Sequence, residues 1–274
     1  MEPITQITTI QSVLYDTLLC FRRICEENGL HYFLSNGSLL GAVKYGDFIP
    51  WDDDCDVFMP REDYDKLIEL FSSDGPYRLF CDTTSPNWRL PYAKLSDTRT
   101  TFTEKGFTFG EEIGLSLDIF PLDRFHPIKW VANCQARYLE LLKRFLICTN
   151  ANSFFTEKKG IKRLILYFIH ITANLLGYKT VKKMIAKQVE KSKGYKKGYV
   201  GCVAWCCYGT GEILSEDIFS ETVSVKFRDL EFPAPGGYDC YLSGLYGDYR
   251  QELPPHRQKS NHNIEVYWND EKKN

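Results

Sequence analysis

The sequence lacks several features that would assign it to a particular class of protein. It has ten cysteines in 274 residues but no pair separated by two residues, so zinc ribbons and thioredoxin-like redox sites have no support. The first ten residues contain neither the basic nor the apolar stretch of a secretory signal. No run reaches the roughly 20 apolar residues that span a bilayer. We therefore expect a cytoplasmic protein whose cysteines are reduced thiols.

The chain also has almost no excess of charge of either sign, because its net charge is only −2. This near-neutrality excludes a general nucleic-acid binder, and we expect no nucleic-acid partner. The charge is unevenly distributed, since residues 158–197 contain twelve Lys or Arg residues and one acidic residue, Glu190. A composition of 43% hydrophobic and 26% charged residues indicates that the chain folds.

Apolar periodicity predicts an α+β fold, a mixed sheet core with a long helical insertion. Helical spacing covers 7–28, 60–71 and about 128–192, and strands are predicted at 30–34, 48–59, 89–97, 114–123, 199–209, 223–227 and 230–235. The chain then divides into a core over 1–127, a basic helical insertion over 128–198, and strands and a tail over 199–274 that complete the core.

The segment "FIPWDDDCDVFMP", residues 48–60, sets four aspartates between apolar residues. If it forms one strand, Asp52, Asp54 and Asp56 point to one face and Asp53 to the other. Carboxylates about 7 Å apart on one face repel each other unless some are protonated or a divalent cation neutralises them. The alternative is a solvated acidic turn, which the apolar flanks disfavour. A calcium-binding EF-hand is also disfavoured, because Val57 stands where that loop needs Gly.

Two neighbouring segments complete a candidate site. Gly37 and Ser38 form a turn before a helix, where free backbone N–H groups and a hydroxyl suit a phosphate. Asp118 lies within an apolar strand and needs a partner, which a metal shared with Asp54 and Asp56 would supply. Together these features predict a magnesium-dependent nucleotide site.

The stretch "SNGSLLGAVKYGDFIPWDDDCDVFMPREDYDKL" resembles the LicD/fukutin family. The segments "YAKLSDTRTTF", "GLSLDIFPLD" and "LYGDYRQELPP" extend the resemblance to roughly residues 10–125 and 200–265. It implies a nucleotidyltransferase-like core and a LicD-type phosphotransferase. Such enzymes transfer a phospho-alcohol, typically phosphocholine, from a CDP-linked donor such as CDP-choline to a hydroxyl of a cell-surface glycan or its lipid-linked precursor.

The resemblance also implies roles for single residues. The implied catalytic and metal-binding residues, for Mg²⁺ or Mn²⁺, are Asp54, Asp56 and Asp118, with Asp52 close by. The implied contacts to the donor phosphates are Gly37, Ser38 and Lys44, and Lys94 is a further candidate from its strand-like setting. Ser38 stands where Thr is common in the family and Lys44 where Arg is common, so the hydroxyl and the charge are kept. Asp118 is also a candidate to accept the proton of the attacking hydroxyl, and a solvated helix lysine is the alternative for Lys44.

The basic segment contains two predicted helices with different patterns. "IKRLILYFIHITANLLGY" is apolar nearly all round but too short to span a bilayer securely. "TVKKMIAKQVEKSKGYKK" is amphipathic, with Val181, Met184, Ile185 and Val189 on one face. We expect the pair to lie peripherally on the anionic inner face of the plasma membrane, where a lipid-linked acceptor would be. The alternative is an ordinary helical subdomain with a solvated basic face.

The identity of the substrates is less constrained by the sequence. A choline head group needs aromatic faces, and the candidates near the motifs are Trp51, Trp88, Tyr92 and Phe120. His256 and His262 either line the acceptor site or are plain surface residues. CDP-ribitol or CDP-ethanolamine are alternative donors, and an inactive scaffold of a glycan-assembly complex is the alternative to an enzyme.

Overall fold

The computed structural model describes residues 2–151, 158–260 and 263–269 and has the expected α+β fold. Its helices are α1 (Ile7–Asn28), α2 (Asn36–Tyr45), α3 (Arg61–Leu70), α4 (Lys129–Asn150), α5 (Ile161–Leu176), α6 (Tyr178–Lys193) and α7 (Tyr238–Tyr246). Its strands are β1 (Glu2–Pro3), β2 (Phe33–Leu34), β3 (Cys55–Pro60), β4 (Ser73–Asp74), β5 (Tyr77–Phe80), β6 (Ala93–Asp97), β7 (Thr100–Glu104), β8 (Ser116–Arg124), β9 (Tyr199–Gly201), β10 (Leu214–Ser215), β11 (Thr222–Phe227), β12 (Leu230–Pro235) and β13 (Ile264–Trp268).

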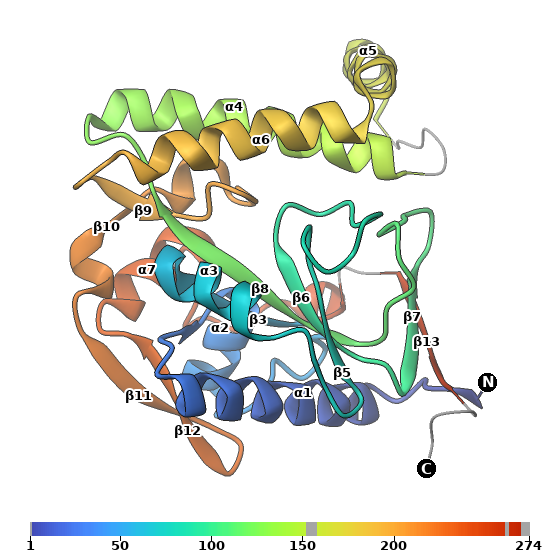
Figure 1. Cartoon of the computed structure of the whole chain (residues 1–274), viewed down its shortest axis with the longest axis vertical. Coiled ribbons are helices and arrows are strands. Elements are labelled where there is room, and N and C mark those ends of the chain that lie inside the picture. The colour runs from blue at the N-terminus through green and yellow to red at the C-terminus, as the bar shows by residue number, and fades with distance from the viewer. Residues whose placement is uncertain (1, 152–157, 261–262, 270–274) are drawn as a thin grey trace.

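Strand β8 lies at the centre of the main sheet (Figure 1). It pairs in parallel with β3 and antiparallel with β6, and its far end pairs with β9. A strand enclosed in this way reads as a nearly continuous apolar run, and Leu117 and Ile119 of β8 are fully buried. The order β10-β9-β8-β6-β5-β4, with β3 and β2 branching from β8, therefore places the middle of β8 in the core.

Helices cover the sheet from two sides, with α1 below it and α4 and α6 side by side above it in the view of Figure 1. The predicted helix over residues 7–28 is confirmed as α1, which is capped by Gly29 with a left-handed φ of 62°. The buried residues of α1 recur every three or four positions, as in Leu14, Leu18 and Phe21. This stripe packs α1 against β6 and β8.

The helices expected between residues 128 and 192 are present as α4, α5 and α6. The apolar face of α6, expected to lie on a membrane, instead packs against α4, because Val181 and Ile185 are buried with Leu142 and Leu146. That part of the membrane prediction is wrong. No single described helix is long and apolar enough to span a membrane, although α5 and α6, bent by 91° at their junction, meet the length and composition of a span when taken together.

Three other segments differ from expectation. The predicted strand over 48–59 begins only at Cys55, because a turn at 50–51 precedes it. The predicted strand over 199–209 is a strand only at Tyr199–Gly201. Cys202 and Cys206 are nevertheless buried, and all ten cysteines are free. Strand β13, for which the sequence predicted no element, pairs with β7. The predicted boundaries between core, insertion and tail stay a prediction.

Candidate active site

Three residues on adjacent strands form the centre of the candidate site. Strand register sets Asp56 of β3 opposite Asp118 of β8, and Asp118 opposite Lys94 of β6. Neighbouring strands lie about 4.8 Å apart, so the three side chains make one row across the sheet. The Lys94 ammonium forms an ion pair with Asp118, and the Tyr92 hydroxyl donates a hydrogen bond to Asp118 Oδ2 at 3.2 Å. Asp118 is therefore held on one side by a cation and faces another carboxylate on the other.

Asp56 and Lys94 of this row are buried and Asp118 is half-buried, which determines the electrostatics of the row. Burial, reinforced by the carboxylates of Asp54 and Asp118, raises the pKa of Asp56 well above its ordinary value. Burial also raises the pKa of Asp118, while the charge of Lys94 opposes that shift. Two carboxylates in a poorly solvated place are stabilised by protonation or by an additional cation. The site consequently favours the binding of positive charge.

The other aspartates of the motif precede β3 in an irregular segment, and only Asp56 lies within the strand. The predicted division of the aspartates between two strand faces is therefore wrong. The Gln11 amide donates to the carbonyl oxygens of Ile49 at 3.0 Å and Asp52 at 2.9 Å, which fixes this segment against α1. As a result, one cavity is lined by all four aspartates, Asp52, Asp53, Asp54 and Asp56. Asp53 Oδ2 also accepts a hydrogen bond from the Ser260 hydroxyl at 2.6 Å.

The start of α2 lies against these carboxylates. A Cβ atom added to Gly37 would be 2.6 Å from Asp52 Oδ2 and 3.8 Å from Asp54 Oδ1, so only glycine fits without displacing Asp52. The Ser38 hydroxyl is buried and accepts the backbone N–H of Asp56 at 2.8 Å. Ser38 thereby fastens the beginning of β3 to α2, and its role as a phosphate contact stays a prediction.

Asn36 is a site residue that the sequence reasoning missed. It has a φ of 46°, a left-handed conformation that Asn tolerates better than most residues, and it lines the cavity. The Tyr241 hydroxyl accepts the Asn36 N–H at 3.1 Å and donates to Asn36 Oδ1 at 2.9 Å. The unusual backbone of Asn36 is thus supported by a buried ring from α7, 205 positions away in the sequence.

Lys44 connects α2 to the C-terminal tail. Its Nζ donates to the carbonyl oxygens of Tyr249 at 3.3 Å and Gln251 at 2.8 Å, and lies 3.2 Å from a carboxylate oxygen of Glu252. Lys44, Tyr249 and Gln251 all line the cavity. Lys44 therefore holds the tail at the cavity wall. The predicted contact between Lys44 and a donor phosphate stays a prediction.

The cavity has a volume of about 770 Å³ and combines these charged groups with aromatic rings. The rings in its wall include those of Trp51, Tyr92, Phe120, Trp205, Tyr208 and Tyr246. Trp88, the remaining aromatic candidate, instead packs in the core between Phe80 and Phe109. His256 is exposed, and His262 lies outside the described residues.

A metal ion fits this donor set in one particular way. Within residues 2–151, 158–260 and 263–269, no three His, Cys, Asp or Glu side chains converge as a preformed metal site. Mg²⁺ does not require such a cage, since it is bound through one or two carboxylates and completes its shell with substrate phosphates and water. The pair formed by Asp56 and Asp118, with Asp54 nearby, meets that smaller requirement.

Comparison with known proteins finds one matching family model and several similar proteins. Residues 29–136, which run from before β2 into α4 and include Gly37, the four aspartates, Lys94 and Asp118, match the profile of the LicD/FKTN/FKRP nucleotidyltransferase domain. The lipopolysaccharide cholinephosphotransferase LicD of Haemophilus influenzae is 26% identical over 270 residues, which cover 94% of this chain and 96% of that protein. The chain is therefore similar to the LicD/FKTN/FKRP domain over residues 29–136 and to a LicD cholinephosphotransferase along nearly its whole length. A second relative is the ribitol 5-phosphate transferase FKRP of human and mouse, 50% identical over 52 residues, which are 19% of this chain and 10% of FKRP.

Proposed function

We propose that this protein is a metal-dependent phosphotransferase. It would move phosphocholine, or a related phospho-alcohol, from a CDP-linked donor to a hydroxyl of a cell-surface glycan or its lipid-linked precursor on the cytoplasmic side. The observation that carries the proposal is the row of Asp56, Asp118 and Lys94 in the wall of one cavity. The names of the two relatives, a cholinephosphotransferase and a ribitol 5-phosphate transferase, support phospho-alcohol transfer.

The carboxylates would hold Mg²⁺ or Mn²⁺. Asp54, Asp56 and Asp118 are the ligands in this proposal, with Asp52 beside them, on a nucleotidyltransferase-like core. When bound, the cation would supply positive charge that neutralises the donor phosphates. The raised pKa of buried Asp56 supports this assignment, because the energetic cost of its ionised form is largest where no added cation is present.

The remaining steps fall to the protein's own groups. The N-terminal end of α2 at Gly37 and the ammonium of Lys94 face the donor phosphates. The acceptor hydroxyl oxygen forms a new bond to the phosphorus on the alcohol side of the diphosphate, and the bond from that phosphorus to the CMP oxygen breaks. The hydroxyl proton passes to Asp118, which Tyr92 and Lys94 orient and which burial makes a stronger base than an exposed aspartate.

The aromatic wall supports choline as the alcohol. The Tyr92 ring centroid lies 4.6 Å from that of Phe120 and 5.4 Å from that of Trp205, so three rings meet next to Asp118. A quaternary ammonium group has no hydrogen to donate and is bound by the faces of such rings. Ribitol phosphate is the second candidate, and the 50% identity to FKRP over 52 residues favours it. The intact carboxylate row argues against an inactive scaffold.

A comparison of donors tests the proposal. CMP release should be measured with CDP-choline, CDP-ethanolamine and CDP-ribitol, with a glycan acceptor and with or without Mg²⁺. We expect metal-dependent CMP release, fastest with CDP-choline. Faster release from CDP-ribitol would retain the enzyme class and reject choline, whereas no release from any donor would reject the transferase.

A further inference from the structure

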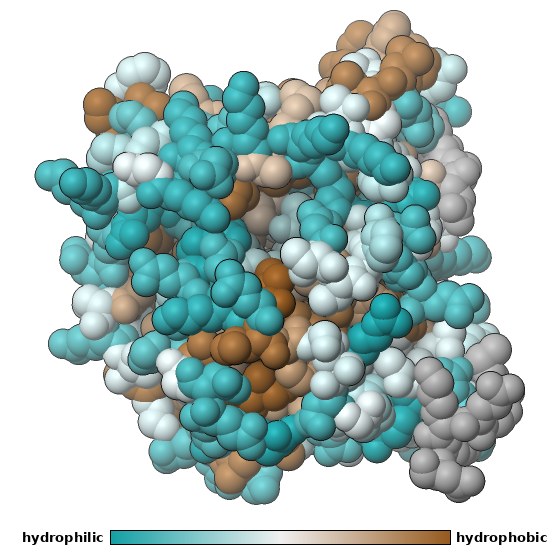
Figure 2. Space-filling view, viewed as in Figure 1, coloured by the Kyte–Doolittle hydropathy of each residue, from teal (hydrophilic) through white to brown (hydrophobic). Residues whose placement is uncertain are grey.

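Helix α5 exposes large apolar side chains along most of its length. Leu175 is 83%, Ile161 69% and Phe168 66% exposed, and Ala173 is the one buried residue of the helix. Ile161, Leu164, Ile165, Phe168 and Leu175 lie at positions i, i+3, i+4, i+7 and i+14, so they share one side of the helix, the α5 face. Apolar residues gather over α5 at the upper right of Figure 2. A contiguous exposed patch of this kind marks an interaction site.

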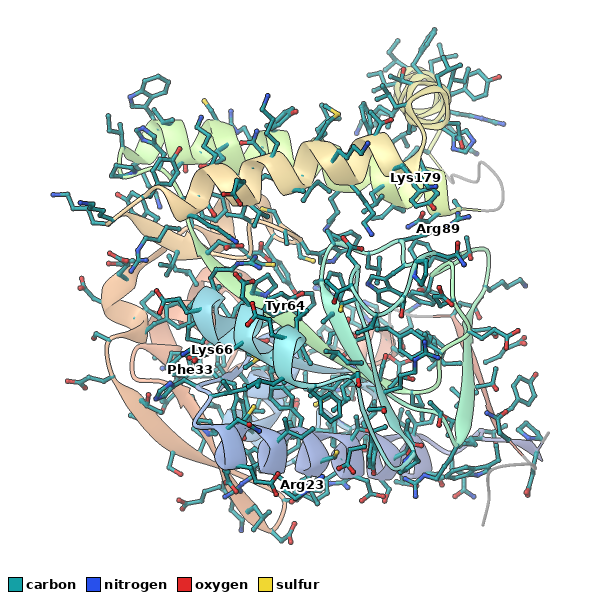
Figure 3. The ribbon with its side chains drawn as sticks, viewed as in Figure 1. Arg23, Phe33, Tyr64, Lys66, Arg89 and Lys179 are labelled. Carbon is teal, nitrogen blue, oxygen red and sulfur yellow. The ribbon has the colours of Figure 1, made fainter. Side chains whose placement is uncertain are left out.

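Helix α6 does not share this exposure, because it is fixed to the core. Lys182 donates to the carbonyl oxygen of Trp88 at 2.6 Å and forms an ion pair with Asp82. The Arg89 guanidinium lies 4.7 Å from the centroid of the Tyr178 ring, at the junction where Figure 3 labels Arg89 and Lys179. Helix α5 leaves this junction at a bend of 91° and lies at the outer edge of the helical layer (Figure 1). Of these two helices, α5 is therefore the one whose apolar side chains are exposed.

The length of α5 sets how it can meet a bilayer. Its 16 residues give a helix of about 24 Å at about 1.5 Å per residue. The hydrocarbon core of a bilayer is about 30 Å thick, so α5 is too short to cross it. A helix with one apolar side lies instead in the plane of the membrane interface, with that side among the acyl chains.

The charges around α5 select the partner. Lys158, Lys159, Lys162 and Arg163 precede or open the helix, and Lys179 follows it. Cations beside an apolar face match a surface that is both negatively charged and apolar beneath, which is an anionic lipid leaflet. A nucleic acid would match the cations and leave the apolar face in water, and a second copy of α5 would bring the same cations against each other.

We propose that α5 is an in-plane membrane anchor that inserts the α5 face into an anionic leaflet. The anchor lies close to the candidate active site, because α5 packs against α4 and Ile147 of α4 lines the cavity. Membrane binding would then hold the cavity near the lipid surface, where an acceptor linked to lipid is concentrated. The proposal itself does not depend on the reaction, since it rests on the exposure and charge of α5.

Sedimentation of the full chain with vesicles tests the anchor. We expect binding to vesicles of phosphatidylcholine with phosphatidylglycerol, little binding to phosphatidylcholine alone, and weaker binding as salt is raised. Phe168→Ser should weaken binding about tenfold, because one large apolar side chain no longer enters the acyl region. Leu70→Ser is the matched control, because Leu70 is exposed to a similar extent (62%) at the end of α3 and lies outside the basic segment.

The outcomes separate the possible partners. Binding of Phe168→Ser/Leu175→Ser as tight as that of the unmodified chain would overturn the proposal, and so would failure of the unmodified chain to bind either vesicle. A concentration-dependent dimer that Phe168→Ser converts to a monomer would assign the α5 face to contact between copies and also overturn it. Both residues are exposed, so thermal unfolding should be unchanged in these variants. If these variants turn over a soluble acceptor as fast as the unmodified chain does, their weaker vesicle binding does not come from a damaged active site.

Discussion

Asp56 of β3 and Asp118 of β8 stand directly opposite each other on adjacent parallel strands, with Lys94 on the far side of Asp118. Like-charged groups in such a register repel each other unless a cation or a proton intervenes. The structure maintains this arrangement in the core of the sheet, where only 7% of Asp56 is exposed. A strained pairing of this kind at a cavity is better explained by function than by stability.

The first prediction concerns this pair. Asp56→Asn and Asp118→Asn should each lower the rate of transfer at least about a hundredfold, as should Asp54→Asn, because each removes a charged ligand of the metal. Unfolding temperature should be unchanged or higher for Asp56→Asn, since a buried repulsion is relieved. Turnover assays and thermal unfolding of the same preparations check both parts. Full activity of Asp56→Asn would contradict the site.

Asp123→Asn serves as the control on the same strand. Asp123 is buried and accepts two hydrogen bonds from Arg61, at 2.7 and 2.8 Å, which fasten α3 to β8. Removing its charge leaves the Arg61 guanidinium without its buried partner and should lower the free energy of unfolding by about 3 kcal/mol. Turnover of the folded protein should be retained. Asp123→Asn should therefore lower stability and keep activity, whereas Asp56→Asn should lower activity and keep stability.

A second prediction uses the close approach of Gly37 to the carboxylates. Gly37→Ala would place a Cβ atom 2.6 Å from Asp52 Oδ2, so the carboxylate must move and the cavity wall must change. We expect donor binding to weaken about tenfold or more, measured by calorimetric titration. Gly244→Ala in α7 is the matched control, because its nearest neighbour would be 3.9 Å away. Equal donor binding by the two variants would show that the start of α2 does not contact the donor.

Lys44→Ala should loosen the tail as well as weaken donor use. The substitution removes two hydrogen bonds to the carbonyl oxygens of residues 249 and 251 and the contact to Glu252. Limited proteolysis should therefore cut the variant faster near residues 249–259, and the KM for the donor should rise about tenfold. Lys226→Ala, on the exposed side of β11, should change neither. An unchanged cleavage pattern in Lys44→Ala would show that Lys44 does not hold the tail.

Stability should depend on pH through Glu212. Burial raises the pKa of Glu212 from its ordinary value of 4.5 to about 7, although Glu212 accepts the Cys207 N–H at 2.9 and 3.0 Å. Between pH 4.5 and 7 the folded protein holds a proton that the unfolded chain has lost. The contribution of Glu212 to the free energy of unfolding is therefore largest below about pH 4.5, and it falls by about 3 kcal/mol as the pH rises to about 7. Denaturant unfolding of Glu212→Gln should show a smaller fall over this range, and an identical fall would contradict the assignment.

Sequence patterns predicted the elements whose structure is decided locally. The apolar spacing over residues 7–28 predicted the bounds of α1, and the apolar run around Asp118 identified β8 as a buried strand. The candidate carboxylates were recognisable because charged residues are rare between large apolar ones. These signals depend on neighbours within a few positions of the chain.

The errors came from contacts between distant parts of the chain. The Gln11 side chain fixes the segment before β3, 38 and 41 positions away, and so takes Asp52 and Asp54 off the strand. The apolar stripe of α6 was expected to lie on a membrane, but it packs against α4. The ion pair of Lys94 with Asp118 follows from the register of β6 on β8, which periodicity within either strand does not fix.

The most direct test of the central claim is calorimetric titration of CDP-choline into the unmodified protein and into Asp56→Asn, each with and without Mg²⁺. The account predicts binding to the unmodified protein that Mg²⁺ strengthens at least tenfold, and a loss of that Mg²⁺ effect in Asp56→Asn. Equal affinity of the two proteins for CDP-choline in the presence of Mg²⁺ would contradict the claim that the carboxylate row holds the metal for a CDP-linked donor.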